Sequence, residues 1–369
     1  MSQHSPVRHC IRVGISPDAF CDAMKNKPHL AFLLEASSLA GGVAVIFEYA
    51  NRLAHIGYPV TILSLDGKPT WFELDKNVKF VTLPSYEQFS TAVKSLGINV
   101  VCATWWMTAY VAHKCVEDNP SVRGMYLVQD IESSYYEQPL YKQAVLDSYS
   151  LGLDHWTTSR WVAAYMKSDI GKACEYIGIG VGKWNERTGK HGRSNQALAI
   201  LRRQALKGVR ELAEVARYLA YHHHIHLNTF GVDNGQVVLS SMHTHIGHEV
   251  DPMTNKAKIL THKRIEEFYS RAGVFLSTSL HEGFSMSPLE AMGAKCPVVM
   301  FNAVGNMEYV DDGVNCLIAT SPRDMSDKAA MLCKDRKFAQ ELAKTAYATY
   351  THFRDWNKPV ERLSKFIDD

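Results

Sequence analysis

The chain has 369 residues, 46% of them hydrophobic and 21% charged, a balance typical of a soluble globular protein with two domains. Its net charge is +2 and no run of basic residues interleaves with aromatics, which argues against a nucleic-acid partner. The eight cysteines form no C-x-x-C pair, as expected of free thiols in the cytoplasm. No apolar stretch suits a secretory signal or a membrane span, so we expect a cytoplasmic protein. Peripheral contact with the inner face of a membrane stays open.

The first elements are typical of a parallel α/β domain. The apolar run 29–36 predicts a buried strand, and the loop SSLAGG, with Gly41 and Gly42, follows it. Apolar residues at helical spacing predict a helix over 43–57, and 59–65 predicts the next strand. A strand, a glycine-rich turn, a helix and a strand in this order start a Rossmann-like domain.

The rest of the chain repeats this alternation. The segment HWTTSRWVAAYMKS (155–168) predicts a helix, and the Gly- and charge-rich stretch at about 175–196 is the best linker candidate. A second alternation then begins with the strand ALAILRR (197–203). We therefore predict four parts: an N-terminal extension without an assignable role at 1–27, Rossmann-like domains at 28–182 and 183–345, and a C-terminal helix at 346–369.

Two glutamates flank a predicted helix start in HEGFSMSPLEAMGAKCPVV. Residues 273–280 predict a buried strand, so Glu282 lies beyond its carboxyl end, where open α/β sheets bind ligands. Ser287, followed by proline, is a natural N-cap and places Glu290 three residues after the cap. That spacing is also a capping box, so a purely structural role for Glu290 stays open. Because a helix N-terminus attracts anions, a phosphate between the two carboxylates points to a ligand holding phosphates and sugars.

This segment resembles the E-x7-E motif of retaining glycosyltransferases of family 4, which have the GT-B fold of two Rossmann-like domains facing each other across a cleft. Glu282-Gly283-Phe284, Pro288-Leu289-Glu290 and the stretch 305–319 match the family in register. Asn306 and Cys316 depart from it, since each replaces a family glycine. We expect the backbone there to be less free to approach a ligand.

A basic pair precedes this segment. Arg202 and Lys207 match the R-x4-K pair of the family, whose cations hold the donor diphosphate. Fixed cations stabilise the charge that develops on a leaving nucleoside diphosphate. Arg203 is an alternative to Arg202, because strand alternation turns only one of them toward the ligand. A solvated basic helix start is the structural alternative.

The first domain carries weaker signals. Gln129 and Asp130 end a strand where many family members have a histidine facing the sugar, so Asp130 is our candidate near the reacting carbon. The pattern Gln-Asp-x-Glu resembles a subgroup that includes bacterial rhamnosyltransferases. Trp105 and Trp106 offer an aromatic platform to an acceptor sugar, with core packing as the alternative. The site implied by the resemblance has catalytic positions at Glu282, Arg202, Lys207 and Asp130, and donor-binding positions at Glu290, Gly283, Phe284, Ser285, Met286, Ser287, Gly41 and Gly42.

Two other patterns suggest cofactors and are rejected. GIGVG (178–182) has the wrong spacing and setting for a nicotinamide site. The histidines of HHHIH (222–226) and HTHIGH (243–248) have no accompanying cysteine pair, so we expect no metal. The resemblance implies transfer of a sugar from a nucleoside-diphosphate sugar to a glycan or lipid-linked acceptor, without a cofactor. A non-catalytic binding or scaffold protein of the same fold, or another GT-B enzyme such as a sugar-nucleotide epimerase, stays open.

Overall fold

The computed structural model describes residues 27–184, 194–202, 204–231, 239–246 and 260–369, and two short strands at 249–250 and 257–258. The chain divides into two compact units. Unit 1 runs to Ile179 and takes up Asn357–Asp369 again, and unit 2 is Gly180–Trp356. The predicted N-terminal extension up to residue 26, the centre of the predicted linker (185–193), Arg203 and His248 lie outside the described residues.

Unit 1 is built on a parallel sheet of seven strands in the order β3-β2-β1-β4-β5-β6-β7. The strands are β1 (Leu30–Leu34), β2 (Val60–Ser64), β3 (Val78–Thr82), β4 (Val100–Ala103), β5 (Arg123–Leu127), β6 (Asp154–Thr157) and β7 (Cys174–Tyr176). All residues of β1, β2 and β4 are buried, which explains why they are continuous apolar runs. The predicted strands at 29–36 and 59–65 are confirmed.

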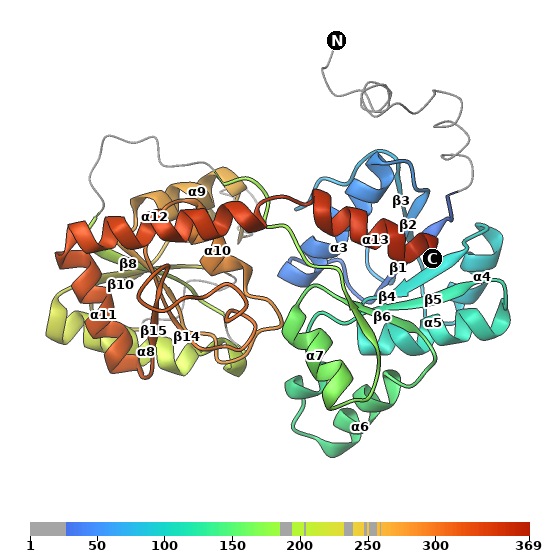
Figure 1. The fold of residues 1–369 in the computed structure, drawn as a ribbon, viewed down its shortest axis with the longest axis horizontal. Helices are drawn as coiled ribbons and strands as arrows, with labels where there is room; N and C mark the ends of the chain where they lie inside the picture. The colour runs from blue at the N-terminus through green and yellow to red at the C-terminus, as the bar shows by residue number, and fades with distance from the viewer. Residues whose placement is uncertain are drawn as a thin grey trace, which may run out of the picture. The chain divides into compact units, whose positions relative to one another are not determined.

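Helices cover both faces of this sheet (Figure 1). They are α3 (Gly41–His55), α4 (Gln88–Ser95), α5 (Trp106–Asp118), η1 (Glu132–Tyr135), α6 (Pro139–Ser148), α7 (Arg160–Ser168) and α13 (Asn357–Asp368). Helices α4 to α7 pack on one face, and α13 contacts α3 on the other. The hydroxyl of Tyr58 donates to Asp368 at 2.7 Å, and Arg123 donates to the carbonyl oxygen of Phe366 at 2.8 Å. These bonds fix the last helix to unit 1.

Unit 2 repeats the plan with a parallel sheet of six strands in the order β10-β9-β8-β13-β14-β15. Its strands are β8 (Gln196–Ile200), β9 (His226–Phe230), β10 (His243–His245), β13 (Val274–Ser277), β14 (Val298–Phe301) and β15 (Leu317–Ala319), beside a separate antiparallel pair, β11 (Glu249–Val250) and β12 (Ala257–Lys258). The helices are η2 (Ala205–Lys207), α8 (Val209–Tyr218), a π-helical turn η3 (Leu219–His223), α9 (His262–Arg271), α10 (Met286–Gly293), α11 (Pro322–Lys334) and α12 (Arg336–Phe353). Figure 1 shows α8 and α11 on one face of the sheet, and α10 packs against α12 on the other.

Two predictions about local structure are wrong. Residues 154–157 form strand β6, and only 160–168 are helical. The strand pairs with β5 and β7, and the side chain of Ser159 caps the following helix by accepting from the amide of Val162. Sheet pairing therefore outweighs the helical pattern of the sequence. Residues 346–353 belong to α12 in unit 2, so the change back to unit 1 falls between Trp356 and Asn357.

Among the described residues, no helix is both long enough and apolar enough to cross a membrane.

Candidate functional site

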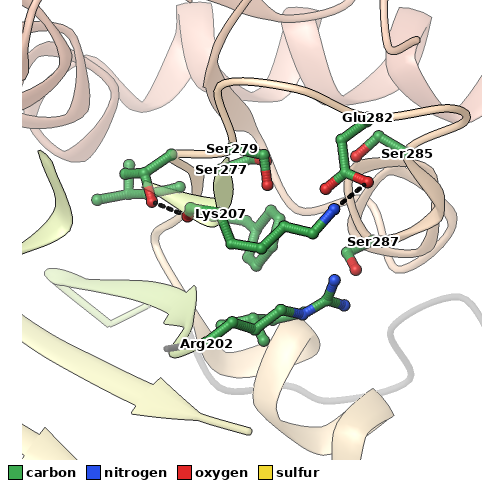
Figure 2. A pocket seen from close by; sticks show the side chains of 11 residues that line it. Arg202, Lys207, Ser277, Ser279, Glu282, Ser285 and Ser287 are labelled. Carbon is green, nitrogen blue, oxygen red and sulfur yellow. Dashed lines mark hydrogen bonds and ion pairs between the residues drawn. The ribbon is translucent and has the colours of Figure 1, made fainter. Parts of the chain in front are cut away.

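A polar pocket opens in unit 2 at the carboxyl ends of β8 and β13, which are neighbouring parallel strands. This is the edge of an open α/β sheet at which ligands bind. Two cations, one carboxylate and several hydroxyl groups line it (Figure 2). The polar side chains are those of Arg202, Lys207, Ser277, Thr278, Ser279, Glu282, Ser285 and Ser287. We call this hollow the unit 2 pocket.

Lys207 is the centre of the charged group. Its ammonium nitrogen lies 2.9 Å from Oε2 of Glu282, and the two side chains are only 14% and 13% exposed. Arg202 extends beside it toward Ser287 (Figure 2). Lys207 and Glu282 thus form an ion pair although they are 75 positions apart in the sequence.

The backbone around Gly208 determines where Lys207 lies. Gly208 has φ +67°, and a Cβ on it would lie 1.9 Å from the carbonyl oxygen of Thr278. The hydroxyl of Thr278 donates to the carbonyl oxygen of Lys207 at 3.3 Å. The amide of Leu280 donates to the carbonyl oxygen of Leu206 at 2.9 Å. Only glycine allows this left-handed turn and this contact together. The helix start after β8 is therefore fixed to the loop after β13.

Glu282 is held by a second close backbone contact. Its amide donates to the carbonyl oxygen of Ala303 at 2.9 Å, and its own carbonyl oxygen accepts from the amide of Gly305 at 3.1 Å. A Cβ on Gly305 would lie 2.2 Å from that oxygen, so glycine is again required. The neighbouring Val304 has φ +61°, which is unusual for a β-branched residue and marks a strained turn.

The helix after Glu282 begins earlier than predicted. Helix α10 starts at Met286, and its N-cap is Ser285 rather than Ser287. Glu290 therefore lies in the second turn, and the capping-box interpretation is wrong. The hydroxyl of Tyr309 donates to the carbonyl oxygen of Ser285 at 2.7 Å and holds the turn that precedes the helix. Ser285 and Ser287 both face the unit 2 pocket.

Glu290 accepts a hydrogen bond from the hydroxyl of Tyr269 at 3.2 Å. Burial raises the pKa of Glu290 to about 7, although the bond from Tyr269 and the charge of Arg202 act in the opposite direction. The carboxyl group therefore changes charge near neutral pH. It lies on the helix whose first turn lines the pocket, close enough to Arg202 for their charges to interact.

The other residues predicted to bind the sugar donor differ in how far they are exposed. Gly283 is buried, and Met286 is partly exposed at the helix start. The ring of Phe284 lies 5.8 Å from that of Tyr309 and 5.9 Å from that of Phe353, so it packs inside unit 2. Phe284 does not line the unit 2 pocket.

The two departures from the family pattern have structural explanations. Asn306 is 1% exposed; its side-chain oxygen accepts from the amide of Ala303 at 3.0 Å and its amide group donates to the carbonyl oxygen of Phe301 at 2.7 Å. It thereby stabilises the loop that positions Glu282. The side chain of Cys316 is fully buried. Neither side chain lines the unit 2 pocket.

In unit 1 the glycine turn lies beside Gln129. The side-chain amide of Gln129 donates to the carbonyl oxygen of Gly42 at 3.3 Å. A Cβ on Gly42 would lie 3.1 Å from the same side chain, while Gly41 begins α3 and is exposed. The turn after β1 and the end of β5 thus meet at one edge of the sheet.

Asp130 and the two tryptophans differ in exposure. Asp130 is 5% exposed and accepts from the hydroxyl of Tyr135 at 2.5 Å. Trp105 is partly exposed, and its ring lies 5.9 Å from that of Tyr135. Trp106 is 8% exposed, and its indole N–H donates to the hydroxyl of Tyr136 at 2.9 Å. This placement favours the packing alternative for Trp106 and leaves Trp105 with a surface face.

The sequence interpretation missed several residues. Ser277 and Ser279 line the pocket, and their i, i+2 spacing at a strand end is a signal that could have found them. Tyr269 is 21 positions away from its partner Glu290, and no motif or spacing in the sequence connects the two residues. Glu132 in unit 1 is 1% exposed and was also overlooked, although it belongs to the Gln-Asp-x-Glu pattern.

Described histidines of the two clusters form hydrogen bonds with nearby side chains of unit 2. His223 lies 2.7 Å from a carboxylate oxygen of Asp327, and His226 bonds the hydroxyl of Thr244 at 2.9 Å. His243 bonds the hydroxyl of Thr229 at 2.8 Å. Within the described ranges, no three His, Cys, Asp or Glu side chains come together as a metal site would require.

Solved structures with the same architecture place the fold in a known class. The chain is similar to sucrose-phosphate synthase from Thermosynechococcus elongatus, with a TM-score of 0.74 at 14% identity, covering 92% of this chain and 98% of the other. It is also similar to Anabaena HepE, solved in complex with UDP-glucose, with a TM-score of 0.71 at 13% identity, covering 92% and 99%. The two parallel-sheet α/β units are those of the GT-B fold, as predicted.

Sequence comparison adds a family match within this fold. Residues 181–349, nearly all of unit 2, match the model of the family described as glycosyl transferases group 1. A curated relative is the GtfA subunit of UDP-N-acetylglucosamine–peptide N-acetylglucosaminyltransferase from Streptococcus pneumoniae serotype 4, 28% identical over 118 residues. That match covers 28% of this chain and 23% of the relative. The unit 2 pocket lies within the matched family region.

Proposed function

We propose that this protein is a retaining, metal-independent glycosyltransferase of family 4. It moves a sugar from a nucleoside-diphosphate sugar to a glycan or lipid-linked acceptor. The observation that carries the proposal is the unit 2 pocket, where Arg202, Lys207 and Glu282 meet two helix-start serines at the carboxyl edge of the sheet. Cations beside hydroxyl and carboxylate groups suit a ligand with phosphates at one end and a sugar at the other.

Each charged residue has a role in this proposal. Arg202 and Lys207 bind the diphosphate and stabilise the charge that develops on it as the sugar leaves. Glu282 accepts hydrogen bonds from the transferred sugar, and Glu290 from the ribose. Because Lys207 forms an ion pair with Glu282, binding of the diphosphate replaces that carboxylate as the partner of Lys207.

The proposed reaction needs no protein nucleophile. The bond between the anomeric carbon and the phosphate oxygen breaks, and the acceptor hydroxyl oxygen bonds to the same face of that carbon. The proton of the acceptor hydroxyl passes to the oxygen of the leaving diphosphate. In unit 1, Asp130 and the exposed face of Trp105 are the proposed contacts for the reacting sugars, beside the Gly41-Gly42 turn.

The comparisons support UDP as the first nucleotide to test. HepE was solved with UDP and with UDP-glucose, and the streptococcal relatives are named for UDP-N-acetylglucosamine. The Gln-Asp-x-Glu pattern keeps a rhamnose donor, and therefore dTDP, among the candidates. We place the reaction in the cytoplasm, where peripheral contact with a membrane would bring a lipid-linked acceptor within reach.

Thermal unfolding with UDP, GDP, dTDP and ADP, each with EDTA, tests the proposal. A nucleotide present at 100 times its Kd adds about 2.7 kcal/mol to the stability of the folded state, which corresponds to a rise in Tm of about 5–10 °C. We expect one nucleotide to cause this rise in the wild type and none in Arg202→Ala/Lys207→Ala. The control Arg336→Ala/Lys344→Ala removes the same charges from exposed positions of unit 2 and keeps the response. If no nucleotide raises the Tm of the wild type, the non-catalytic scaffold replaces this proposal.

A further inference from the structure

Tyr269 is a core residue of unit 2 that reaches the candidate site only through its hydroxyl group. It lies on α9 and is fully buried. Its ring packs at 5.2 Å from Phe275 and 5.6 Å from Trp184, both edge-on. The hydroxyl then donates to Oε2 of Glu290 on α10 at 3.2 Å. A phenylalanine would satisfy the packing, so the hydroxyl group needs a separate explanation.

We propose that Tyr269 is a positioning residue of the nucleotide site, which holds one carboxylate oxygen of Glu290 and leaves the other for the hydroxyl groups of a ribose. The inference rests on the proposed role of Glu290. Neither Tyr269 nor Glu290 is among the residues that line the unit 2 pocket. Glu290 lies on α10, whose first turn lines the pocket, and the hydroxyl of Tyr269 donates to this carboxylate, so it would act on a ligand through Glu290. A buried tyrosine on a packed helix has few alternative conformations, and this makes it a rigid support for a ligand-binding carboxylate.

The hydrogen bond also bears on the charge of Glu290. A donor favours the ionised carboxylate, and only that form offers acceptors on both oxygens. Burial already raises the pKa of Glu290 to about 7, so the loss of a donor moves the titration further above neutral pH. Tyr269 therefore keeps a larger fraction of Glu290 in the form that accepts hydrogen bonds from sugar hydroxyls.

Among the residues that the structure describes, few other groups around Glu290 can influence its charge. The interacting or neighbouring titratable groups come from the end of β8, α9, the loop after α10, the loop after β14 and α12. They are Arg202, Tyr269, Cys296, Tyr309 and Tyr350, beside the Lys207–Glu282 pair in the pocket. Of these, Arg202 and Tyr269 stabilise the ionised form of Glu290.

The test compares Tyr269→Phe with the wild type by calorimetric titration of UDP at about pH 6, 7, 8 and 9. Loss of a hydrogen bond to a carboxylate raises its pKa by about one unit, which lowers the ionised fraction at pH 7 from about a half to about a tenth. We therefore expect UDP to bind about fivefold more weakly to Tyr269→Phe at pH 7, with the difference falling below about twofold at pH 9. We compare the ratio of the UDP affinities of the two proteins at each pH, because the titration of UDP itself affects both affinities equally and cancels in the ratio.

Tyr350→Phe is the matched control. Tyr350 is also fully buried in unit 2, and its hydroxyl donates to the carbonyl oxygen of Gly182 at 2.9 Å and accepts from the amide of Trp184 at 2.6 Å. The substitution removes a buried hydroxyl with comparable hydrogen bonds, so it reproduces a general loss of stability. We expect it to leave the ratio of UDP affinities constant with pH.

A second readout does not depend on a ligand. In protein labelled with ¹³C at the glutamate carboxyl carbons, the Glu290 signal, assigned with Glu290→Gln, should titrate about one pH unit higher in Tyr269→Phe. Equal UDP affinities at every pH in the wild type and Tyr269→Phe would overturn the inference and leave the proposed function intact. If the wild type binds none of the four nucleotides, the proposed function fails and the nucleotide role of Tyr269 fails with it. If Glu290 also titrates at the same pH in the wild type and in Tyr269→Phe, the proposed effect of Tyr269 on the charge of this carboxylate is refuted as well.

Discussion

The substitution Glu132→Gln tests the carboxyl group that is most deeply buried among the described residues of unit 1. Oε2 of Glu132 accepts from the amide of Trp106 at 2.7 Å and from the hydroxyl of Tyr126 at 2.8 Å. Burial raises the pKa of Glu132 to about 8, against the lowering effect of both hydrogen bonds. A glutamine has the same shape and can place its carbonyl oxygen where Oε2 accepts both bonds, so the substitution removes the titration and little else.

The sign and size of the effect follow from proton linkage. Between the pKa of an unfolded glutamate and about 8, the unfolded chain has lost the proton and the folded chain retains it. The contribution of Glu132 to stability is therefore fully present below this window and is lost as the pH rises through it. The shift corresponds to a loss on the order of 3–5 kcal/mol, which the glutamine variant does not suffer.

Thermal unfolding at about pH 5, 6, 7 and 8 measures this difference, with calorimetry to separate the transitions of the two units. We expect Glu132→Gln and the wild type to differ by less than about 2 °C at pH 5, and the variant to melt about 10 °C higher at pH 8. Glu137→Gln, at an exposed position of the same unit, is the control and should follow the wild type. A difference between Glu132→Gln and the wild type that stays constant from pH 5 to 8 would refute the burial argument.

Two further predictions concern the unit 2 pocket. Gly208→Ala should lower the free energy of unfolding in urea by at least about 2 kcal/mol more than Gly313→Ala, because both positions have positive φ but only Gly208 lacks room for a Cβ. Glu282→Gln should release Lys207, so that affinity for the nucleoside diphosphate rises about threefold in calorimetric titration. Sugar transfer from the corresponding sugar nucleotide should fall at least about tenfold in the same variant.

Each of these predictions has an outcome that contradicts it. Equal destabilisation by Gly208→Ala and Gly313→Ala would mean that the close contact with Thr278 does not constrain the loop. If Glu282→Gln weakens nucleotide binding as much as Lys207→Ala does, the ion pair supports the site instead of competing with the ligand. Unchanged transfer in Glu282→Gln would remove Glu282 from the proposed reaction.

Local pattern was sufficient for much of the fold. Strands such as 30–34 and 60–64 are buried on both faces, and their continuous apolar runs are visible in the sequence. Alternation of such runs with amphipathic helices predicted two parallel α/β units, because parallel strands need covered faces and crossover helices. The pattern failed at 154–157, where pairing with two neighbouring strands decided the conformation.

For the candidate site, too, the sequence indicated some of the residues, and the tertiary structure alone showed how they contact one another. Strand-end and helix-start patterns, which are local features, singled out Glu282 and Glu290 from the sequence, and the resemblance to family 4 added Arg202 and Lys207. Only the tertiary structure showed that Lys207 pairs with Glu282 and that Glu290 bonds Tyr269 instead of capping its own helix. Such contacts join residues from different elements, and the sheet order and close backbone packing that create them have no signature at any single sequence spacing.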